Sequence, residues 1–295
     1  MEKNELSESG SLLIGVKVDL VIGNPPFSIK KVGNKKTHPI WDKFVKKSFE
    51  LCKDGGYVAL VHPGAWRDVE GRFKDTQELL RSKQVEYLEL HNTKDGFATF
   101  KVGTDYGWYV VRNVENTKKT EIKFQDSEPQ MLDIRNMEFI PNAQLEKFQS
   151  LFAKDGEEKT EIMYDRTMYE TRQPYVAKTK TKKFRYPCAY MVAKGDGVKP
   201  FWSAKKLGHF GVPKLIWSNG AVKSAGSFAD TKGKYGLTQF AYAIVDTPKN
   251  LPKIKAVFDS KEFRDFIVHG SPSYLSINRK VISLFRKDWW KGFLK

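Results

Sequence analysis

Two consecutive prolines, Pro25 and Pro26, end a short apolar run and constrain the chain more strongly than any other feature of this sequence. The run VDLVI (18–22) is rich in β-branched residues, which is typical of a strand, and Gly23 and Asn24 separate it from the prolines. Each proline fixes its own φ angle and removes a backbone donor, and Pro25 also restricts Asn24. The sequence therefore predicts a strand that ends at a stiff, non-helical exit.

The next ninety residues alternate between helical and strand patterns. In the first helical pattern, Trp41, Phe44, Val45, Phe49 and Cys52 recur at helical spacing. Strands separated by helices are typical of an open, doubly wound sheet with mainly parallel strands. The predicted elements are helices at 39–54 and 68–83, and strands at 57–63, 85–92 and 106–113.

The second half of the chain has a different texture and a different charge. The net charge is +16, but residues 1–145 hold 22 basic against 21 acidic side chains, whereas residues 146–295 hold 29 against 14. Short aromatic strands such as 214–219 lie among Gly, Pro, Ser and Lys, and two helical stretches follow, near 249–269 and 276–293. The sequence predicts an α/β domain over 1–145 and a basic α+β domain over 146–295. Charge segregated in this way indicates a polyanionic partner that binds mainly the second half.

Several classes of protein are excluded by composition. No apolar run approaches the ~18–20 residues that span a bilayer, and the polar, acidic first ten residues do not resemble a signal peptide. Cys52 and Cys188 are far apart, and none of the five histidines has the spacing of a metal site. We therefore expect a reduced, cytoplasmic protein with no membrane partner and no metal.

Several motifs in register carry a resemblance to a known family. DLVIGNPPF (19–27) resembles the catalytic motif of SAM-dependent amino methyltransferases, and this version is similar to that of adenine-specific (N6) DNA methyltransferases of the gamma group. KDGGYVALVHPGAW (53–66) and the block that begins at 85 and ends with FATFKVGTDYGWYVVRN (97–113) resemble the family motifs that follow. The resemblance covers about residues 16–113 and extends loosely to the segment that begins PKLIWSNG (213–220).

The resemblance implies a Rossmann-like methyltransferase sheet, SAM as cofactor and double-stranded DNA as partner. The exocyclic amine of adenine is a poor nucleophile, because its lone pair is delocalised into the ring. Acceptors on the Asn24 side chain and the Pro25 backbone would orient that amine, and Pro26 helps to hold them in place. Phe27 would stack on the base once it is flipped from the duplex. The predicted catalytic residues are therefore Asn24, Pro25, Pro26 and Phe27.

A second aromatic residue is expected on the other side of the flipped base. Phe100 best matches the family position for this contact, and Phe97 is the alternative. Core packing is the competing interpretation for both rings. Trp66 is a further candidate for the same cleft, although an aromatic residue in a loop beside a proline is often structural. His62 and His91, at strand ends without neighbouring Cys or His, are interpreted as non-catalytic.

Basic residues in the second half are expected to neutralise DNA phosphates, and a solvated lysine-rich surface is the competing interpretation. Aromatic side chains are interleaved with them, which favours nucleic acid. Base readout would fall to Asn219, Ser218, Gln239 or Arg185. The predicted DNA-binding residues are Lys180, Lys182, Lys183, Arg185, Lys205, Lys206, Lys214, Lys223, Lys232 and Lys234.

The motifs that bind SAM in this family are missing from the expected place. A glycine-rich loop and an acidic residue should precede NPPF, and only 23 residues precede Asn24. Downstream, only KGDG (194–197) and GKYG (233–236) are candidates, and neither follows a clear strand and opens a helix. Three explanations stay open: a second polypeptide supplies the SAM site, the chain is an inactive remnant, or SAM binds in an unrecognised way. We expect the isolated chain neither to bind SAM tightly nor to methylate DNA.

The sequence thus favours a site-specific DNA adenine-N6 methyltransferase, or its catalytic and target-recognition half. One alternative is a catalytically inactive DNA-binding specificity protein on a methyltransferase scaffold. Another is an amino methyltransferase that acts on RNA or protein, since related motifs serve those substrates. The basic, aromatic second half argues for nucleic acid over protein, and no acidic cluster supports a fused nuclease.

Overall fold

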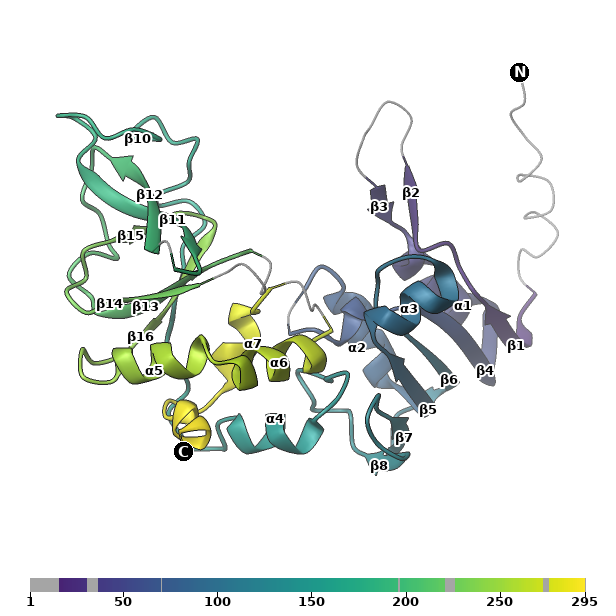
Figure 1. Cartoon of the computed structure of the whole chain (residues 1–295). Helices are drawn as coiled ribbons and strands as arrows, with labels where there is room; N and C mark the ends of the chain where they lie inside the picture. The colour runs from purple at the N-terminus through teal and green to yellow at the C-terminus, as the bar shows by residue number, and fades with distance from the viewer. Residues whose placement is uncertain are drawn as a thin grey trace, which may run out of the picture. The chain divides into compact units, whose positions relative to one another are not determined.

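The computed structural model describes residues 16–30, 37–69, 71–195, 197–220, 226–272 and 276–294. The chain divides into two compact units, Met1–Ala143 (unit 1) and Gln144–Lys295 (unit 2). Each unit has its own sheets and helices (Figure 1). Within these ranges no helix has the length and apolar character needed to cross a membrane.

Unit 1 is built on a six-stranded sheet in the order β1-β4-β6-β5-β7-β8. β1 pairs with β4 and β5 with β7 in parallel, whereas β4–β6, β5–β6 and β7–β8 are antiparallel. The strands are β1 (Val18–Gly23), β4 (Cys52–Pro63), β5 (Lys83–His91), β6 (Tyr106–Glu115), β7 (Thr120–Lys123) and β8 (Gln130–Leu132).

The fold class is therefore mixed α/β, as predicted, but the expectation of a mainly parallel sheet holds only in part. β1, β4, β5 and β7 run in one direction, while β6 and β8 run in the other, so most neighbouring pairs are antiparallel. β6 follows β5 through α3 (Thr93–Phe100), inserts between β4 and β5, and runs antiparallel to both.

The helices of unit 1 are shorter than the predicted stretches. α1 (Trp41–Leu51) buries Trp41, Val45 and Phe49 along one face, as the spacing predicts. Cys52, expected at the end of this helix, is instead the buried first residue of β4. The stretch predicted as a helix at 68–83 begins with turns, and only α2 (Lys74–Ser82) is helical there.

Two short elements position the residues around NPPF. After Phe27 the chain forms a two-stranded sheet from β2 (Ser28–Lys30) and β3 (Thr37–Pro39). α3 (Thr93–Phe100) lies within the block predicted to carry the second aromatic residue, and the Asn92 side chain caps it by accepting from the backbone of Lys94 and Asp95. A one-turn 3₁₀ helix, η2 (Gly64–Arg67), follows β4.

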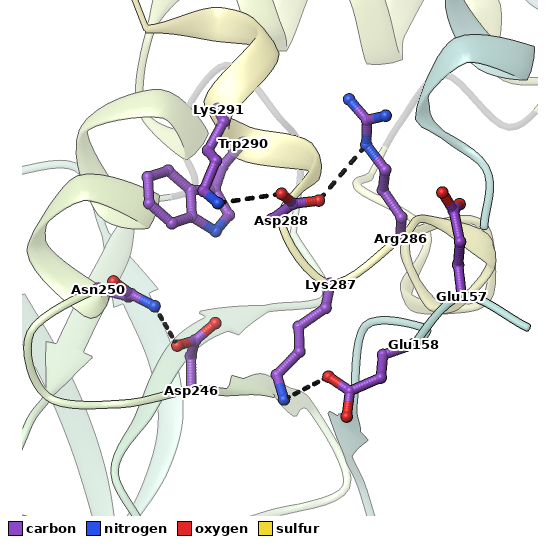
Figure 2. A pocket seen from close by; sticks show the side chains of 9 residues that line it. All are labelled: Glu157, Glu158, Asp246, Asn250, Arg286, Lys287, Asp288, Trp290 and Lys291. Atoms are coloured by element: carbon purple, nitrogen blue, oxygen red, sulfur yellow. Dashed lines mark hydrogen bonds and ion pairs between the residues drawn. The ribbon is translucent and has the colours of Figure 1, made fainter.

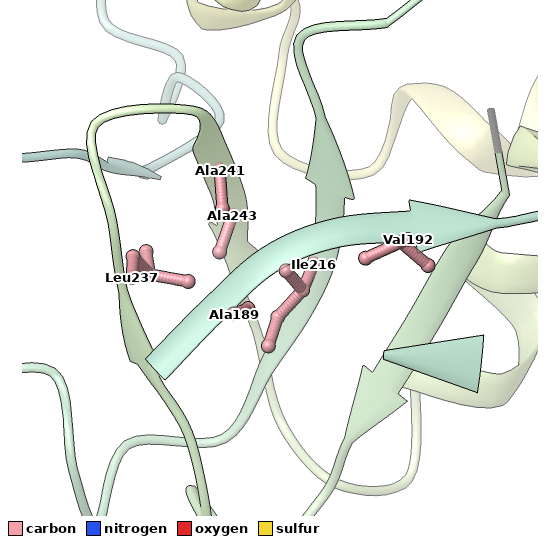
Figure 3. Packing of buried hydrophobic residues seen from close by; sticks show 6 residues of the cluster. All are labelled: Ala189, Val192, Ile216, Leu237, Ala241 and Ala243. Atoms are coloured by element: carbon pink, nitrogen blue, oxygen red, sulfur yellow. The ribbon is translucent and has the colours of Figure 1, made fainter. Parts of the chain in front are cut away.

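Unit 2 contains two four-stranded sheets, ordered β10-β12-β11-β15 and β14-β13-β16-β9. Buried apolar side chains from β11, β13, β15 and β16 form a shared core, which includes Val192, Ile216 and Leu237 (Figure 3). The strands are β9 (Ile162–Met163), β10 (Val176–Ala177), β11 (Tyr186–Ala193), β12 (Gly197–Ser203), β13 (Lys214–Ser218), β14 (Ser227–Asp230), β15 (Gly236–Leu237) and β16 (Ala241–Val245).

The helical stretches predicted in unit 2 are each interrupted. The stretch at 249–269 forms two helices, because Ser260 accepts from the backbone N–H of Phe263 and caps a new helix. The side chains of Phe263 and Trp289 pack with ring centroids 4.8 Å apart. The elements are α4 (Leu145–Leu151), α5 (Leu251–Phe258), α6 (Lys261–Gly270), α7 (Arg279–Leu284) and the 3₁₀ helix η3 (Trp289–Phe293).

Candidate active site and nucleic-acid interface

The carboxyl ends of β1, β4 and β5 share one edge of the unit 1 sheet, since these strands run in the same direction. Tyr106, the first residue of β6, lies opposite both Pro63 at the end of β4 and His91 at the end of β5. Asn24 follows β1 at this same edge. Carboxyl ends of strands are where open α/β sheets place their ligands, so this edge, the rim, is the candidate active site.

The rim leaves the predicted acceptor pair free. Asn24 is exposed and Pro25 is buried. In the described part of the chain, neither the Asn24 side chain nor the Pro25 carbonyl takes part in a hydrogen bond. The Phe27 carbonyl, two residues after Pro25, is hydrogen-bonded: it accepts from the backbone N–H of Ile40, 3.2 Å away. The backbone after the prolines is therefore anchored beside α1, while the two acceptors face no protein donor.

Phe27 and Phe100 are brought together at the rim. Their ring centroids lie 5.2 Å apart at an interplanar angle of 69°, an edge-to-face contact. Phe100 also meets Tyr106 edge-to-face, at 5.0 Å. Phe97, the alternative, is 61% exposed. The sequence favoured Phe100 over Phe97 as the second aromatic residue, and Phe100 is the ring that contacts Phe27. With the rings in contact no base fits between them, so one ring must turn aside before both can stack on it.

A polar cavity of about 410 Å³ lies beside this aromatic group. His91 stacks on Tyr106 with centroids 4.5 Å apart, and its ring nitrogens approach Glu89 at 3.3 Å and Asp95 at 3.4 Å. Lys123 pairs with the same Glu89 carboxylate at 3.3 Å. His91, interpreted from the sequence as non-catalytic, is therefore held by neighbours and stays in the wall of the rim.

Trp66 and His62 lie in the core beneath the rim. Trp66 is buried, so it does not line an open cleft. The fully buried His62 stacks on Trp41 at 4.4 Å and accepts at Nε2 from the Tyr109 hydroxyl at 3.0 Å. Burial lowers the pKa of His62 to about 4, so the ring is neutral at neutral pH. Both side chains have structural roles, which is the interpretation that the sequence favoured for His62.

A buried arginine ties together the loops that frame the rim. Arg67 donates to Asp105 Oδ2 at 3.1 Å, to Asn142 Oδ1 at 2.7 Å and to the carbonyl of Ile140 at 3.1 Å. Burial lowers its pKa to about 10, which still leaves it charged at neutral pH. A Cβ on Gly64 would overlap both Arg67 and Asp105. This network, which no sequence motif revealed, fixes the loop after β4 against the turn before β6.

In unit 2, five of the ten predicted DNA-binding cations lie over aromatic rings. Cation–ring distances are 5.1 Å for Lys180 over Trp202 and 4.6 Å for Lys205 over Tyr175. Similar contacts join Lys183 to Phe184, Arg185 to Tyr186 and Lys234 to Tyr235. Eight predicted cations are exposed and form no ion pair with a described residue: Lys180, Lys182, Lys183, Arg185, Lys205, Lys206, Lys232 and Lys234.

Lys214 is a correction to the predicted set. Its side chain is 0% exposed, and its ammonium donates to Asp230 at 3.3 Å and to the carbonyls of His209 and Val212. Burial lowers the pKa of Lys214, and the Asp230 carboxylate opposes that shift. A buried, paired ammonium does not reach a phosphate, so Lys214 stabilises the core of unit 2 instead. Lys223, also predicted, lies outside the described residues.

Two of the four predicted base readers are already engaged. The buried Ser218 hydroxyl accepts from the backbone of Val192 at 3.2 Å, and the Gln239 amide bonds both the backbone and the hydroxyl of Thr171. Asn219 and Arg185 are exposed. The structure therefore narrows the available readers to these two.

Two exposed lysines were missed by sequence reasoning. Lys194 follows β11, and Lys199 on β12 lies opposite Met191. Lys194 belongs to the KGDG stretch (194–197), and Lys199 follows that stretch by two residues. Their position in the basic segment 178–234, on both sides of a Gly-Asp-Gly stretch that is typical of a turn, could have indicated them.

A cavity in unit 2, of about 480 Å³, is lined mainly by charged side chains (Figure 2). Lys287 pairs with Glu158 at 2.8 Å, while Arg286 at 3.5 Å and Lys291 at 3.0 Å pair with Asp288. Each cation here has a carboxylate partner. This cavity therefore differs from the surface described above, and it is a poor site for a phosphate.

Neither of the two glycine turns that the sequence offered has the form of a SAM-binding loop. In KGDG (194–197), Lys194 and Gly195 follow β11, Gly197 begins β12, and Gly195 and Gly197 have φ angles of 84° and 70°. GKYG (233–236) lies between β14 and β15, where a Cβ on Gly233 would overlap the backbone of Gly211. Neither glycine turn opens a helix, so neither offers the helix N-terminus that holds the anionic group of a nucleotide cofactor. Among the described side chains no group of three His, Cys, Asp or Glu is placed to hold a metal ion.

Comparison with known proteins finds one matching family model and several similar solved structures. Residues 4–97, less than half of the chain, match the family described as Eco57I restriction-modification methylase. No curated protein matches. Among solved structures, this chain is similar to the M protein of the type I restriction enzyme EcoKI (16% identity, TM-score 0.32, covering 56% of this chain and 39% of that one).

Two further solved structures are similar to this chain. One is the methyltransferase subunit of a type I restriction-modification system from Streptococcus thermophilus (13% identity, TM-score 0.27, 40% of this chain and 29% of that one). The other is the type IIL restriction-modification enzyme MmeI in complex with DNA (9% identity, TM-score 0.43, 90% of this chain and 45% of that one). This chain spans less than half the length of each of the three.

Proposed function

We propose that this chain is the catalytic-motif and target-recognition part of a site-specific DNA adenine-N6 methyltransferase of a restriction-modification system. The observation that carries the proposal is the rim: Asn24 and Pro25 present unpaired acceptors at the exit of β1, beside the contact between Phe27 and Phe100. The match of residues 4–97 to restriction-modification methylases supports it.

The rim would act on the amine of a flipped adenine. Asn24 Oδ1 and the Pro25 carbonyl accept the two N6 hydrogens, which leaves the nitrogen lone pair directed away from the ring plane. Because Pro25 and Pro26 restrict the backbone, the acceptors are in place before the base arrives and little reorganisation is needed. Phe27 then stacks on the base, and Phe100 moves from its edge-to-face contact to cover the opposite side.

The basic surface of unit 2 would hold duplex DNA. Its eight exposed, unpaired cations offer charge to phosphates without first breaking an ion pair within the protein. Binding of this kind releases counterions, so its affinity should fall steeply as salt rises. In residues 178–234 the acids are Asp196, outside the described residues, and Asp230, which Lys214 neutralises. The described surface of this segment therefore presents only positive charge.

SAM would be the methyl donor, held by a second polypeptide. The support comes from β1, an edge strand that pairs with β4 alone among the described strands. Leu20 and Ile22 on β1 are 54% and 76% exposed. Open edges with apolar side chains are templates for another strand. A partner that extends the sheet past β1 would bring its donor next to Asn24. The two free thiols, Cys52 and Cys188, are both buried, which is consistent with the proposed cytoplasmic setting.

The test is methyl transfer by the chain purified from its native host with whatever partner accompanies it. Labelled SAM and duplex DNA are supplied, and the modified nucleoside is identified by mass spectrometry after hydrolysis. We expect N6-methyladenine, and Asn24→Ala should lower kcat by about 100-fold or more while DNA affinity is retained. Asn136→Ala, an exposed asparagine in the same unit, is the matched control.

Each other result rejects part of the proposal. Normal methylation by Asn24→Ala would remove Asn24 from the catalytic set. Methyl groups recovered on RNA or protein, but not on DNA, would overturn the substrate. DNA binding without methyl transfer from any preparation would favour the inactive specificity protein.

A further inference from the structure

A small cavity in unit 2, of about 180 Å³, lies where β11 and β13 end. Tyr190 and Met191 contribute from β11, Ser218 and Asn219 from the end of β13, and Phe240 from the turn before β16. This cavity, the β11–β13 cavity, belongs to neither the rim nor the charged cavity of Figure 2. Ser218 and Asn219 form a polar wall, and Tyr190, Met191 and Phe240 form an apolar wall. Each wall limits the chemical groups that the cavity can bind.

The polar wall presents one free amide. The backbone N–H of Asn219 donates to the Phe240 carbonyl at 2.8 Å, so the position of this residue is anchored. Its side chain is exposed and has no hydrogen-bond partner among the described residues. The neighbouring Ser218 hydroxyl is buried and bonded to Val192. Asn219 therefore offers a donor and an acceptor, side by side, on a fixed backbone.

The apolar wall of the cavity is open to solvent. Met191 is 44% and Phe240 is 40% exposed, and Tyr190 meets Phe240 edge-to-face with centroids 5.3 Å apart. Tyr190 is braced from behind by Phe201, at 4.7 Å. Braced apolar side chains that stay open to solvent mark a contact surface for an apolar group.

The surrounding charge selects a nucleic acid. Lys199 lies opposite Met191 in the strand register, and Lys194 directly follows the β11 wall of the cavity. Both are exposed, and the described residues between 178 and 240 carry no exposed acid. A polyanion approaching this surface would meet positive charge close to the β11 wall of the cavity.

We propose that the β11–β13 cavity reads an A·T base pair in the major groove, an inference that rests on the proposed DNA partner. Adenine presents an N7 acceptor beside an N6 donor, which matches the donor and acceptor of the Asn219 amide; guanine presents two acceptors and does not. The thymine of the pair, or of a neighbouring step, places its methyl group against Met191 and Phe240. Methyl contact of this kind is the apolar part of base recognition.

The experiment begins with selection of bound duplexes from a randomised pool by the full chain, at fixed salt. We expect at least one strongly selected A·T pair. In the selected duplex, 7-deaza-adenine at that position removes only the N7 acceptor, and uracil in place of thymine removes only the methyl group. Each should weaken binding by about 10-fold. These arms use the unaltered protein, so no variant has to fold.

Two variants separate the two walls. Asn219→Ala should lose its sensitivity to 7-deaza-adenine and keep its sensitivity to uracil, and Phe240→Ala should show the reverse. Lys205→Ala, a phosphate ligand away from the cavity walls, should weaken all duplexes alike. Binding without any preference for an A·T pair, or a preference unchanged in Asn219→Ala, overturns the inference while the DNA partner stands. Failure to retain any duplex at low salt overturns the DNA partner as well.

Discussion

At the scale of single residues, Lys214 and Asn24 show how environment changes the role of a side chain. Both lie in segments where the sequence predicted contact with nucleic acid. Lys214 is enclosed by Asp230 and two carbonyls, whereas Asn24 is exposed with an unpaired amide. A buried ammonium is retained by its partner and unavailable to a phosphate, while a free amide remains available to a ligand.

Lys214→Met should therefore change stability rather than DNA binding. Removing the ammonium leaves the Asp230 carboxylate buried, supported only by the backbone N–H groups of Lys234 and Tyr235. We expect the free energy of unfolding of unit 2 to fall by about 3 kcal/mol, measured by urea denaturation of the full chain. Lys205→Ala, on the exposed surface, should do the opposite and lower DNA affinity with stability nearly unchanged. Equal loss of DNA affinity in both variants, with no loss of stability, would restore Lys214 to the interface.

His62 should make unit 1 sensitive to acid. Its pKa is lowered by burial from 6.5 to about 4, so between these values the unfolded chain binds the proton and the folded one does not. The stabilising effect is complete above pH 6.5 and is lost as the pH falls towards 4, with a total of about 3 kcal/mol. Hydrogen exchange of the β4 amides at pH 7 and pH 5 measures it. His62→Gln should be less stable at pH 7 but show a smaller difference between the two pH values; an unchanged difference would assign the effect to other groups.

At the scale of elements, the rim depends on close backbone contacts within the connection between β5 and β6. α3 begins at the Asn92 cap and ends at Phe100, and Lys101 then adopts a left-handed conformation with φ of 59°. The turn that follows returns the chain into β6, whose first residue, Tyr106, contacts Phe100. The position of Phe100 against Phe27 therefore depends on how closely α3 packs on this turn.

Gly96 is the point at which that packing is closest. A Cβ at this position would overlap the carbonyl of Thr104, so Gly96→Ala must displace α3 from the turn. We expect a loss of about 1–3 kcal/mol in stability and faster hydrogen exchange in residues 93–106. Gly103→Ala is the matched control, because its Cβ would lie 3.8 Å from the nearest atom, Thr93 Cγ2. If both variants behave alike, close packing at Gly96 does not set the position of α3.

At the scale of the whole molecule, the two units carry different kinds of surface. The unit 1 sheet buries one face: Val58 and Leu60 are buried, and His62 on that face stacks on Trp41 of α1. The register places Leu20 beside Tyr57 on the other face, and both are exposed. Unit 2 carries the eight exposed cations that form no ion pair with a described residue. Apolar surface around an open strand edge suits a polypeptide partner, and unpaired positive charge suits a polyanion.

Ile22→Lys should therefore separate assembly from folding. The side chain is 76% exposed, so a lysine costs little in the isolated chain, but its charge would be buried by a strand and its flanking helices placed on β1. We expect the chain purified from its native host to lose its partner, seen as a smaller mass in light scattering, and to lose methyl transfer. Met131→Lys replaces an exposed apolar residue on β8, the opposite edge strand, and should leave both unchanged. Retention of the partner by Ile22→Lys would place that partner elsewhere.

The sequence by itself determined the strands and the stiff exit from β1. Strands predicted at 18–22, 57–63, 85–92 and 106–113 are present with shifts of a few residues at their ends. They could be predicted because β-branched apolar runs and the Pro25–Pro26 pair act locally, through backbone sterics and burial. The helix ends were predicted less accurately. The apolar spacing continues past the points where the helices stop, because Ser260 caps a new helix and turns precede Lys74.

Only the tertiary structure decided which residues meet. Antiparallel insertion of β6 between β4 and β5 sets Tyr106 opposite both Pro63 and His91, and it brings Phe100 rather than Phe97 against Phe27. The burial of Lys214 is likewise decided by strands distant in sequence, β13 and β14. Side-chain type and spacing predict which residues can form strands, helices or charged surfaces. Pairing, burial and free hydrogen-bonding capacity depend on contacts between segments, and these exist only once the sheets have formed.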